Sequence, residues 1–169
     1  MGPLVRDFRA GDEPVLAAVM FSSIHELARQ DYSPAQLEAW APSQYDEDQW
    51  AARIRAIHPF VAEVDGGVAG YADLQVTGYI DHFFVAGPYS RRGVGTALMQ
   101  HIHLAAQERH IVELWSNVSL TAESFFAKHG FIVEARQSVS LRGVTMPNSR
   151  MRKQLVANSP SSRHADARG

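Results

Sequence analysis

A basic, glycine-containing turn is the segment of this sequence best suited to bind a charged ligand. It comprises residues 88–96, between residues that predict a strand and residues that predict a helix. The first N–H groups of a helix lack intrahelical partners and, with the helix dipole, bind anions. Gly93 and Gly95 would let an anion approach the backbone, and Arg91 and Arg92 add positive charge. The spacing therefore predicts a phosphate-binding turn, with an ordinary strand-to-helix turn and solvated arginines as the alternative.

Two common phosphate-binding motifs do not fit this turn. The P-loop has four residues between its glycines and then a lysine, whereas here five residues separate Gly87 from Gly93 and no lysine follows. The dinucleotide-binding motif has a third small residue where this chain has Leu98, and it belongs to a βαβ unit rather than to a meander. The turn must therefore serve another ligand.

Composition excludes several other classes of protein. The chain has 169 residues, no cysteine and a net charge of −2 from 16 basic and 18 acidic side chains. Without cysteine there is no disulfide scaffold, thiolate zinc site, iron–sulfur cluster or cysteine nucleophile. The balanced charge argues against a dedicated nucleic-acid-binding protein. No apolar run is long enough to span a membrane, and residues 1–10 do not resemble a secretory signal, so we expect a cytoplasmic protein.

Apolar spacing and turn residues predict the elements that position this turn. Helices are expected from residue 12 to about 30, from 34, after 46–48, from 93 to about 109 and over 121–129; strands are expected over 4–8, 60–64, 68–76, 79–86, 111–115, 131–141 and 144–155. This order predicts an α/β (α+β) layer fold around one mixed, twisted sheet of six or seven strands flanked by helices. We expect one domain over residues 1–156 and a polar C-terminal tail over 157–169.

Capping residues mark the starts of the first three helices. Asp12 is expected to cap the first helix, and Ser33 with Pro34 the second. The acidic residues 46–48 suit the positive end of the third helix dipole.

Two motifs give the sequence a resemblance to the GNAT superfamily of N-acetyltransferases, over roughly residues 4–155. The first is the acetyl-CoA motif Gln/Arg-x-x-Gly-x-Gly/Ala, after a strand that ends in apolar-x-Val and a Pro-aromatic turn. The chain has Phe83-Phe84-Val85, then Pro88-Tyr89, then residues 90–95 as Ser-Arg-Arg-Gly-Val-Gly, with Ser90 in place of Gln or Arg.

The second motif lies downstream, where the family commonly shows Asn-x-x-Ala-x-x-apolar-Tyr-x-x-x-Gly-Phe. Residues 119–131 agree at Ala122, Phe125, Gly130 and Phe131. Ser119 replaces the asparagine and Phe126 replaces the tyrosine. These two changes bear on mechanism rather than on fold.

The resemblance implies a GNAT-like domain that transfers an acetyl group from acetyl-CoA, its co-substrate, to a primary amine by direct attack in a ternary complex. The sheet should splay into a V between its fourth and fifth strands. The resemblance places the pantetheine there, against the backbone of Phe83, Phe84 and Val85, and the pyrophosphate on the amides of Arg91, Arg92, Gly93, Val94, Gly95 and Thr96. No metal is expected, because the paired histidines His101 and His103 would point apart on a helix.

Asp81 is the first candidate for the base that takes the proton of the amine, or for its anchor. It lies two residues before Phe83 and so on the same face of the expected strand, at a level where the family often has a carboxylate. The alternative is that Asp81 holds a turn or His82. Asp73 and Glu63 are weaker candidates, each readily explained as a solvent-facing strand residue. O-acetyl transfer would need a stronger base, such as His82 turned into the cleft.

Protonation of the departing thiolate lacks an obvious donor, because Phe126 has no hydroxyl group. Tyr71, Tyr79 and Tyr89 are the substitutes considered, with packing roles as the alternative. A thiol pKa of about 8.5 also allows the thiolate to leave with solvent protonation.

The acceptor would meet the first helices and the last hairpin, as the resemblance implies. These carry Tyr32, Trp40, Trp50, the acidic residues 46–48, Arg142, Asn148 and Arg150. The aromatic residues could line a pocket for an apolar amine or belong to the core. His25 is expected to be a surface histidine. The partner is thus a small-molecule or peptide amine, with no nucleic acid and no membrane, and a homodimer is left open. The alternative function is a non-catalytic acyl-CoA-binding sensor or interaction module.

Overall fold

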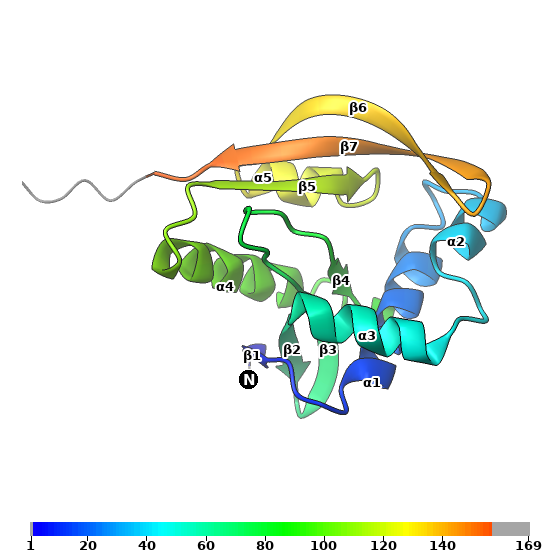
Figure 1. The fold of residues 1–169 in the computed structure, drawn as a ribbon, viewed down its shortest axis with the longest axis horizontal. Helices are drawn as coiled ribbons and strands as arrows, with labels where there is room; N and C mark the ends of the chain where they lie inside the picture. Colours follow the sequence, from blue (N-terminus) through cyan, green and yellow to red (C-terminus); the bar gives the residue numbers. More distant parts are fainter. Residues whose placement is uncertain (1, 157–169) are drawn as a thin grey trace, which may run out of the picture.

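The computed structural model describes residues 2–156, which form an α+β fold of seven strands and five α-helices (Figure 1). In chain order these are β1 (Leu4–Asp7), α1 (Glu13–Ser22), a π-helical turn (Ser23–Leu27), α2 (Pro34–Trp40), α3 (Glu47–Ile57), β2 (Phe60–Val64), β3 (Gly67–Ala72), β4 (Phe83–Val85), a 3₁₀ turn (Gly87–Tyr89), α4 (Val94–Glu108), β5 (Glu113–Ser119), α5 (Glu123–Lys128), β6 (Ile132–Leu141) and β7 (Val144–Gln154). The tail expected over 157–169 lies outside the described residues, so the domain boundary stays a prediction.

The seven strands are present as expected, and the structure divides them into two sheets. One has the order β1-β2-β3-β4 and the other β5-β7-β6, and every neighbouring pair is antiparallel. The splay between the fourth and fifth strands is confirmed, because β4 and β5 belong to different sheets. A parallel bridge between Tyr79 and Trp115 connects the two sheets just before they part.

The strand expected over residues 79–86 is shorter than predicted, since β4 spans only Phe83–Val85. A buried side chain explains this. The Oδ1 atom of Asp73 accepts the backbone N–H groups of Asp81 and His82, both at 2.8 Å. These two amides therefore bind a carboxylate instead of extending a ladder.

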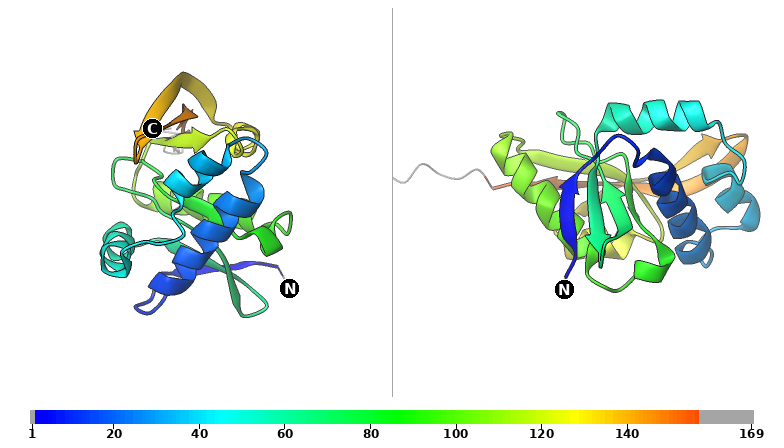
Figure 2. Two further views of the ribbon diagram at one scale, coloured as in Figure 1. Left: turned by 90° about the vertical axis from the view of Figure 1, so that its right-hand side faces the viewer. Right: turned by 90° about the horizontal axis from the view of Figure 1, so that it is seen from below.

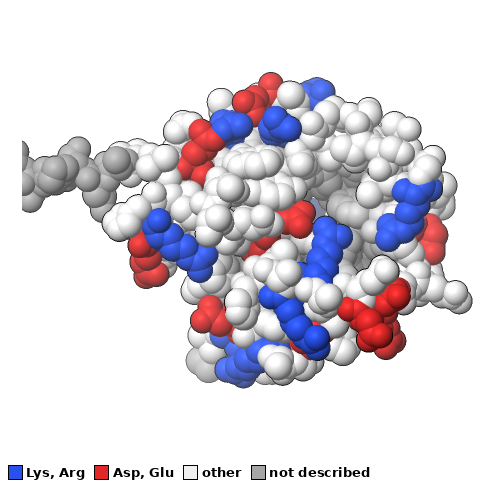
Figure 3. Space-filling view, viewed as in Figure 1, with Lys and Arg blue, Asp and Glu red and all other residues white. Residues whose placement is uncertain are grey.

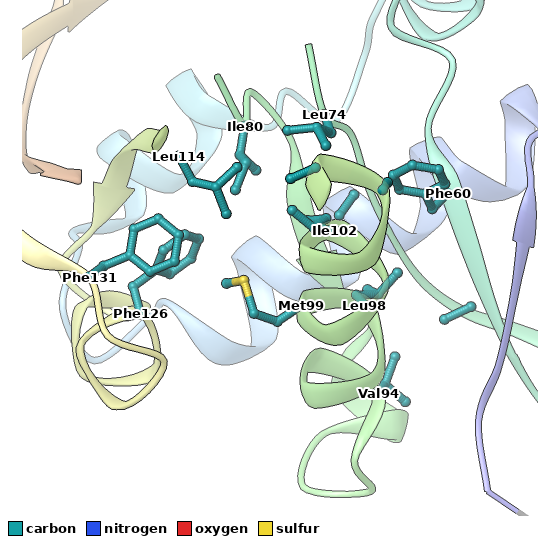
Figure 4. Close-up of a cluster of buried hydrophobic side chains, with 14 of the residues drawn as sticks. Phe60, Leu74, Ile80, Val94, Leu98, Met99, Ile102, Leu114, Phe126 and Phe131 are labelled. Atoms are coloured by element: carbon teal, nitrogen blue, oxygen red, sulfur yellow. The ribbon is translucent and has the colours of Figure 1, made fainter. Parts of the chain in front are cut away.

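Helices cover both faces of the first sheet, as alternate residues of β2 show. Phe60, Ala62 and Val64 belong to the core cluster beneath α4, whereas Val61 packs with residues of α1 and α3. On α4, Leu98, Met99 and Ile102 point into the main cluster, where they meet Phe126 of α5 and Phe131, which directly precedes β6 (Figure 4). This packing fixes the start of α4 next to the splay.

The long β6–β7 hairpin reaches over the open end of the splay, and its tip lies beside α2 (Figures 1 and 2). The hairpin turns at Arg142 and Gly143, which have φ values of +47° and +77°. The N-terminus of α2 has the expected cap, since Ser33 and Gln36 form a reciprocal capping box.

One expected cap is wrong. Asp12 precedes α1, but it makes no side-chain cap hydrogen bond. Its carboxylate instead accepts two hydrogen bonds from Arg6, at 2.8 and 3.0 Å. At the start of α3 the sequence predicted only favourable negative charge, and the structure adds a cap, since Asp46 accepts the N–H of Gln49. Among the described residues, no helix has both the length and the apolar character needed to cross a membrane.

Candidate active site

A cavity of about 320 Å³ opens where β4 and β5 part. We divide its lining into two halves. The β4–β5 half comes from the backbone of β4, the start of α4, the end of β5 and α5. The hairpin half comes from the π-helical turn, Tyr32, Trp40, the Phe84 side chain and the β6–β7 hairpin. Asp81 also lines the cavity. The surface is hollowed on the face seen in Figure 3, with basic side chains on either side of the hollow.

The β4–β5 half has the features of a site for an extended, anionic ligand. Strand β4 pairs with β3 on one side and is the last strand of its sheet, so its other edge has no strand partner in the described chain. Gly93 caps α4 with a φ of +80°, a conformation that suits glycine, and a Cβ built there would meet nothing within 4 Å. The backbone at the helix start is therefore approachable.

The predicted cofactor-binding residues divide into two groups. Phe83, Phe84, Val85 and Gly95 line the cavity. The remaining five lie on the adjoining turn and first helical turn, where Arg91, Arg92, Gly93 and Thr96 are exposed and the Val94 side chain is buried in the core. Only the backbone of Val94 could serve a ligand.

Arg92 is partly engaged elsewhere. Its guanidinium lies 3.5 Å from the Asp65 carboxylate and 5.5 Å from the centre of the Tyr89 ring. Both Arg92 and Asp65 are about half exposed or more, so this ion pair is weak and could yield to a phosphate.

Asp81 is held at the junction of the two halves. Its carboxylate lies 3.4 Å from Arg53 Nη2, accepts a hydrogen bond from the Tyr79 hydroxyl at 3.3 Å, and is 24% exposed. It thus lines the cavity on an ordered support and closes no turn, but the alternative contact with the His82 side chain is present as well. The turn-holding role considered for Asp81 belongs to Asp73.

Asp73 is fully buried, which contradicts its expected position facing solvent. Its Oδ1 atom accepts hydrogen bonds from the backbone N–H groups of Asp81 and His82, and its Oδ2 atom accepts one from the Gln75 side chain at 3.2 Å. Burial raises the pKa of Asp73 to about 6. Asp73 is therefore a support for the segment that carries Asp81, and it does not line the cavity. Glu63, the other weaker candidate, pairs with Arg6 away from the cavity.

The imidazole of His82 is buried, with its Nε2 atom 3.7 Å from the Asp81 carboxylate. Its Nδ1 atom is 2.9 Å from the Tyr71 hydroxyl, and burial lowers the pKa of the imidazole to about 4. It is therefore neutral near pH 7 and does not line the cavity. The turned-in His82 that O-acetyl transfer would require is not found.

The three tyrosines considered as proton donors lie outside the cavity lining. Tyr71 is bonded to His82, Tyr79 stacks on Trp115 with ring centres 4.3 Å apart, and Tyr89 packs near Gly67. Phe126, which replaces the family's tyrosine, is 2% exposed. Its ring packs among three other phenylalanines, with ring centres 5.0 to 5.9 Å away.

Tyr32 has a role that the sequence did not reveal. Its hydroxyl accepts the N–H of Leu120 at 2.9 Å and donates to the carbonyl of Pro147 at 2.7 Å, so it joins both halves of the cavity. Burial raises the pKa of this hydroxyl. Its partners are far away along the chain, so no local pattern could have indicated them.

Two further contacts fix the hairpin half. The Gln36 side chain donates to the carbonyl of Thr145 at 3.0 Å, and Arg142 donates to the carbonyl of Ala39 at 2.6 Å. Asn148, also on β7, lines the cavity with its Oδ1 atom buried and without a hydrogen-bond partner.

The three other histidines considered in the sequence have structural partners. His101 packs on Phe60, His103 contacts the carbonyl of Met99 and the Lys153 ammonium, and His25 contacts the carbonyl of Ala41. In residues 2–156, no three His, Asp or Glu side chains gather in a way that could hold a metal.

Comparison with known proteins agrees with this geometry. The sequence model of the acetyltransferase (GNAT) domain matches residues 28–155. The chain is 33% identical over 148 residues to the uncharacterized N-acetyltransferase YafP of Escherichia coli K12, a match that covers 88% of this chain and 93% of that protein.

Solved structures give the same answer. A GCN5-related N-acetyltransferase from Rhodopseudomonas palustris has a TM-score of 0.87 and 35% identity, and the match covers 92% of this chain and 97% of that one. The PaiA N-acetyltransferase of Thermoplasma acidophilum, solved with coenzyme A, has a TM-score of 0.71 and 18% identity, with 91% and 99% covered. The chain belongs to the GNAT family of N-acetyltransferases, enzymes that act with acetyl-CoA.

Proposed function

We propose that this enzyme moves the acetyl group of acetyl-CoA to a primary amine of a small molecule or peptide, with Asp81 as the base or anchor for that amine. One observation carries the proposal: Asp81 lines the cavity where the two sheets part, between an open strand edge and a separate, mostly apolar half. A donor and an acceptor can therefore enter from different sides and meet beside a carboxylate.

The donor is assigned to the β4–β5 half. The unpaired edge of Phe83, Phe84 and Val85 can hydrogen-bond the pantetheine amides as an added strand would. The amides of residues 91–96 suit the pyrophosphate, because the helix start combines free N–H groups, a favourable dipole and an approachable Gly93.

The amine must lose a proton before it attacks, since an alkylammonium has a pKa of about 10. Asp81 accepts that proton directly or through one water. The nitrogen lone pair then forms the new C–N bond to the thioester carbonyl, the C–S bond breaks, the nitrogen releases its second proton to solvent, and the thiolate takes a proton from solvent. Arg53 and Tyr79 orient the Asp81 carboxylate during this transfer.

The test is Asp81→Asn, with Asp7→Asn as a matched control because Asp7 is exposed on β1. Loss of a general base should lower kcat by about 100-fold or more, while acetyl-CoA affinity measured by calorimetry stays near native. Thiol release should be measured across a panel of amines and pH values. An unchanged kcat and pH profile in Asp81→Asn would remove Asp81 from the mechanism.

A further inference from the structure

The hairpin half of the cavity is built mainly from apolar and aromatic side chains. Three aromatic rings meet there, with the Trp40 ring centre 5.6 Å from that of Tyr32 and 6.1 Å from that of Phe84. The aliphatic part comes from Ile24, Leu27, Val139, Leu141 and Met146. Such a wall favours an apolar body over a hydrated one.

The charged side chains of the cavity suit a ligand with a single positive charge. Asp81 is the single carboxylate among the described lining residues, and no lysine or arginine lines the cavity. Arg53 and Arg142 line an adjoining surface hollow, where they repel a second cation.

The acidic residues of that neighbouring hollow are already engaged. Glu38 accepts the N–H and hydroxyl of Ser43, and Asp46 caps α3. Arg53 and Arg142 balance the charges of these two carboxylates, so the neighbouring hollow offers no net negative charge to the second ammonium group of a polyamine or basic peptide.

Asn148 adds a polar requirement. Its Oδ1 atom is buried against the cavity and accepts no hydrogen bond within the described structure, although buried carbonyl oxygens are rarely left unpaired. In register, Asn148 lies between Ser119 of β5 and Gln137 of β6, so neighbouring strands fix its position. A hydroxyl or N–H group on a bound molecule would satisfy this oxygen.

The volume limits the size of that molecule. A cavity of about 150 Å³ holds a benzene-sized ligand. The cavity of about 320 Å³ must also receive the acetyl end of the donor, which leaves room for a body of about one ring.

From these observations, we propose that the acceptor is a small primary amine with a single positive charge, an apolar or aromatic body of about one ring, and a hydrogen-bond donor on that body that pairs with Asn148. The inference rests on the proposed function. The amine and acetyl-CoA become the N-acetyl amine and the free thiol of CoA, and the proton lost by the amine leaves through Asp81.

The experiment measures thiol release from acetyl-CoA with 2-phenylethylamine, its 3-hydroxy and 4-hydroxy derivatives, butane-1,4-diamine, spermidine and a lysine-containing peptide. We expect kcat/KM for the phenylethylamines to exceed that for the diamine, spermidine and peptide by about tenfold or more. At least one hydroxylated derivative should exceed the unsubstituted amine by about tenfold, because a buried acceptor discriminates against a ligand that leaves it unpaired.

Two variants test the residues that carry the argument. Asn148→Leu should abolish the preference for the hydroxylated amine, and Trp40→Ala should raise KM for all the aromatic amines, with acetyl-CoA binding unchanged in both. Gln107→Leu is the matched control, since this amide is exposed on α4 and does not line the cavity. Calorimetry with acetyl-CoA reports whether each variant is folded.

The outcomes separate the two proposals. Thiol release that is fastest with spermidine or the peptide would overturn the aromatic-amine inference and leave the proposed function intact. A hydroxyl preference that persists in Asn148→Leu would overturn the role of Asn148. Acetyl-CoA binding without release for any amine would overturn both the inference and the proposed function.

Discussion

Replacing Asp73 by asparagine should change how the stability of this protein depends on pH. Asparagine keeps an Oδ1 atom that can accept the amides of Asp81 and His82, but it cannot ionise. In the folded protein, burial raises the pKa of Asp73 from its ordinary value of 3.8 to about 6. The folded state therefore binds more protons at this site than the unfolded state between those two values, and stability falls as pH rises through this range.

The magnitude follows from the size of this displacement. A rise from 3.8 to about 6 corresponds to a cost of about 3 kcal/mol once Asp73 is ionised. About 2 kcal/mol of this develops between about pH 4.5 and about pH 7.5, because the unfolded chain is already partly ionised at the lower pH. The asparagine variant avoids this cost, so it should gain about 2 kcal/mol relative to the native protein over that interval.

Urea unfolding of both proteins at about pH 4.5, 6 and 7.5 measures the difference. His82 contributes with the opposite sign, because its pKa is lowered to about 4, but it is present in both proteins and its contribution cancels. Asp65→Asn is the control, since the Asp65 side chain is 68% exposed. A difference between Asp73→Asn and native protein that stays constant across this range would refute the assignment of Asp73 as a buried, late-ionising carboxylate.

Two further substitutions probe the cavity. Gly95→Val should lower acetyl-CoA affinity by about tenfold or more while the fold is kept, because its Cβ would lie on the cavity 3.2 Å from the Phe125 ring. Calorimetry measures this affinity, and Gly2→Val is the control because Gly2 lies in open space. Native affinity in Gly95→Val would contradict the placement of acetyl-CoA in this cavity. Tyr32→Phe should lower the free energy of unfolding by about 1–3 kcal/mol, because it leaves both the N–H of Leu120 and the carbonyl of Pro147 without their partner. Urea unfolding measures the second effect, and unchanged stability would mean that this tie contributes nothing.

Local signals predicted the parts of the fold that depend on neighbouring residues. The Asp65-Gly66 and Arg142-Gly143 turns have positive φ at both residues, as tight hairpins require. The Ser33 cap and the strand–turn–helix over residues 83–108 also follow from short-range chemistry. The sequence could therefore indicate where a phosphate-bearing ligand would meet the chain.

The features that the sequence did not predict depend on hydrogen bonds between residues of different elements. Asp73 looked like a surface residue because its amide partners, Asp81 and His82, belong to the next segment of the meander. Asp12 looked like a helix cap, but Arg6 from β1 competes successfully for its carboxylate. In both cases the decisive interaction depends on the tertiary fold.

The roles of the predicted binding residues remain predictions. The two halves of the cavity differ in how far local sequence signals could indicate them. Residues 83–96 are contiguous, so their spacing alone could suggest a common ligand. The hairpin half joins Tyr32 and Trp40 to residues of β6 and β7 more than 90 positions away, and no spacing rule links them.

The way in which the β6–β7 hairpin is anchored has a consequence for divergence among related sequences. Tyr32 and Gln36 bind the hairpin through the carbonyl oxygens of Pro147 and Thr145, groups that every residue type possesses. The cavity-facing side chains of the hairpin can therefore be exchanged without loss of these attachments. Under the proposed function, substitutions at positions such as Val139 and Asn148 would change acceptor preference while the hairpin keeps its place and the donor side stays intact.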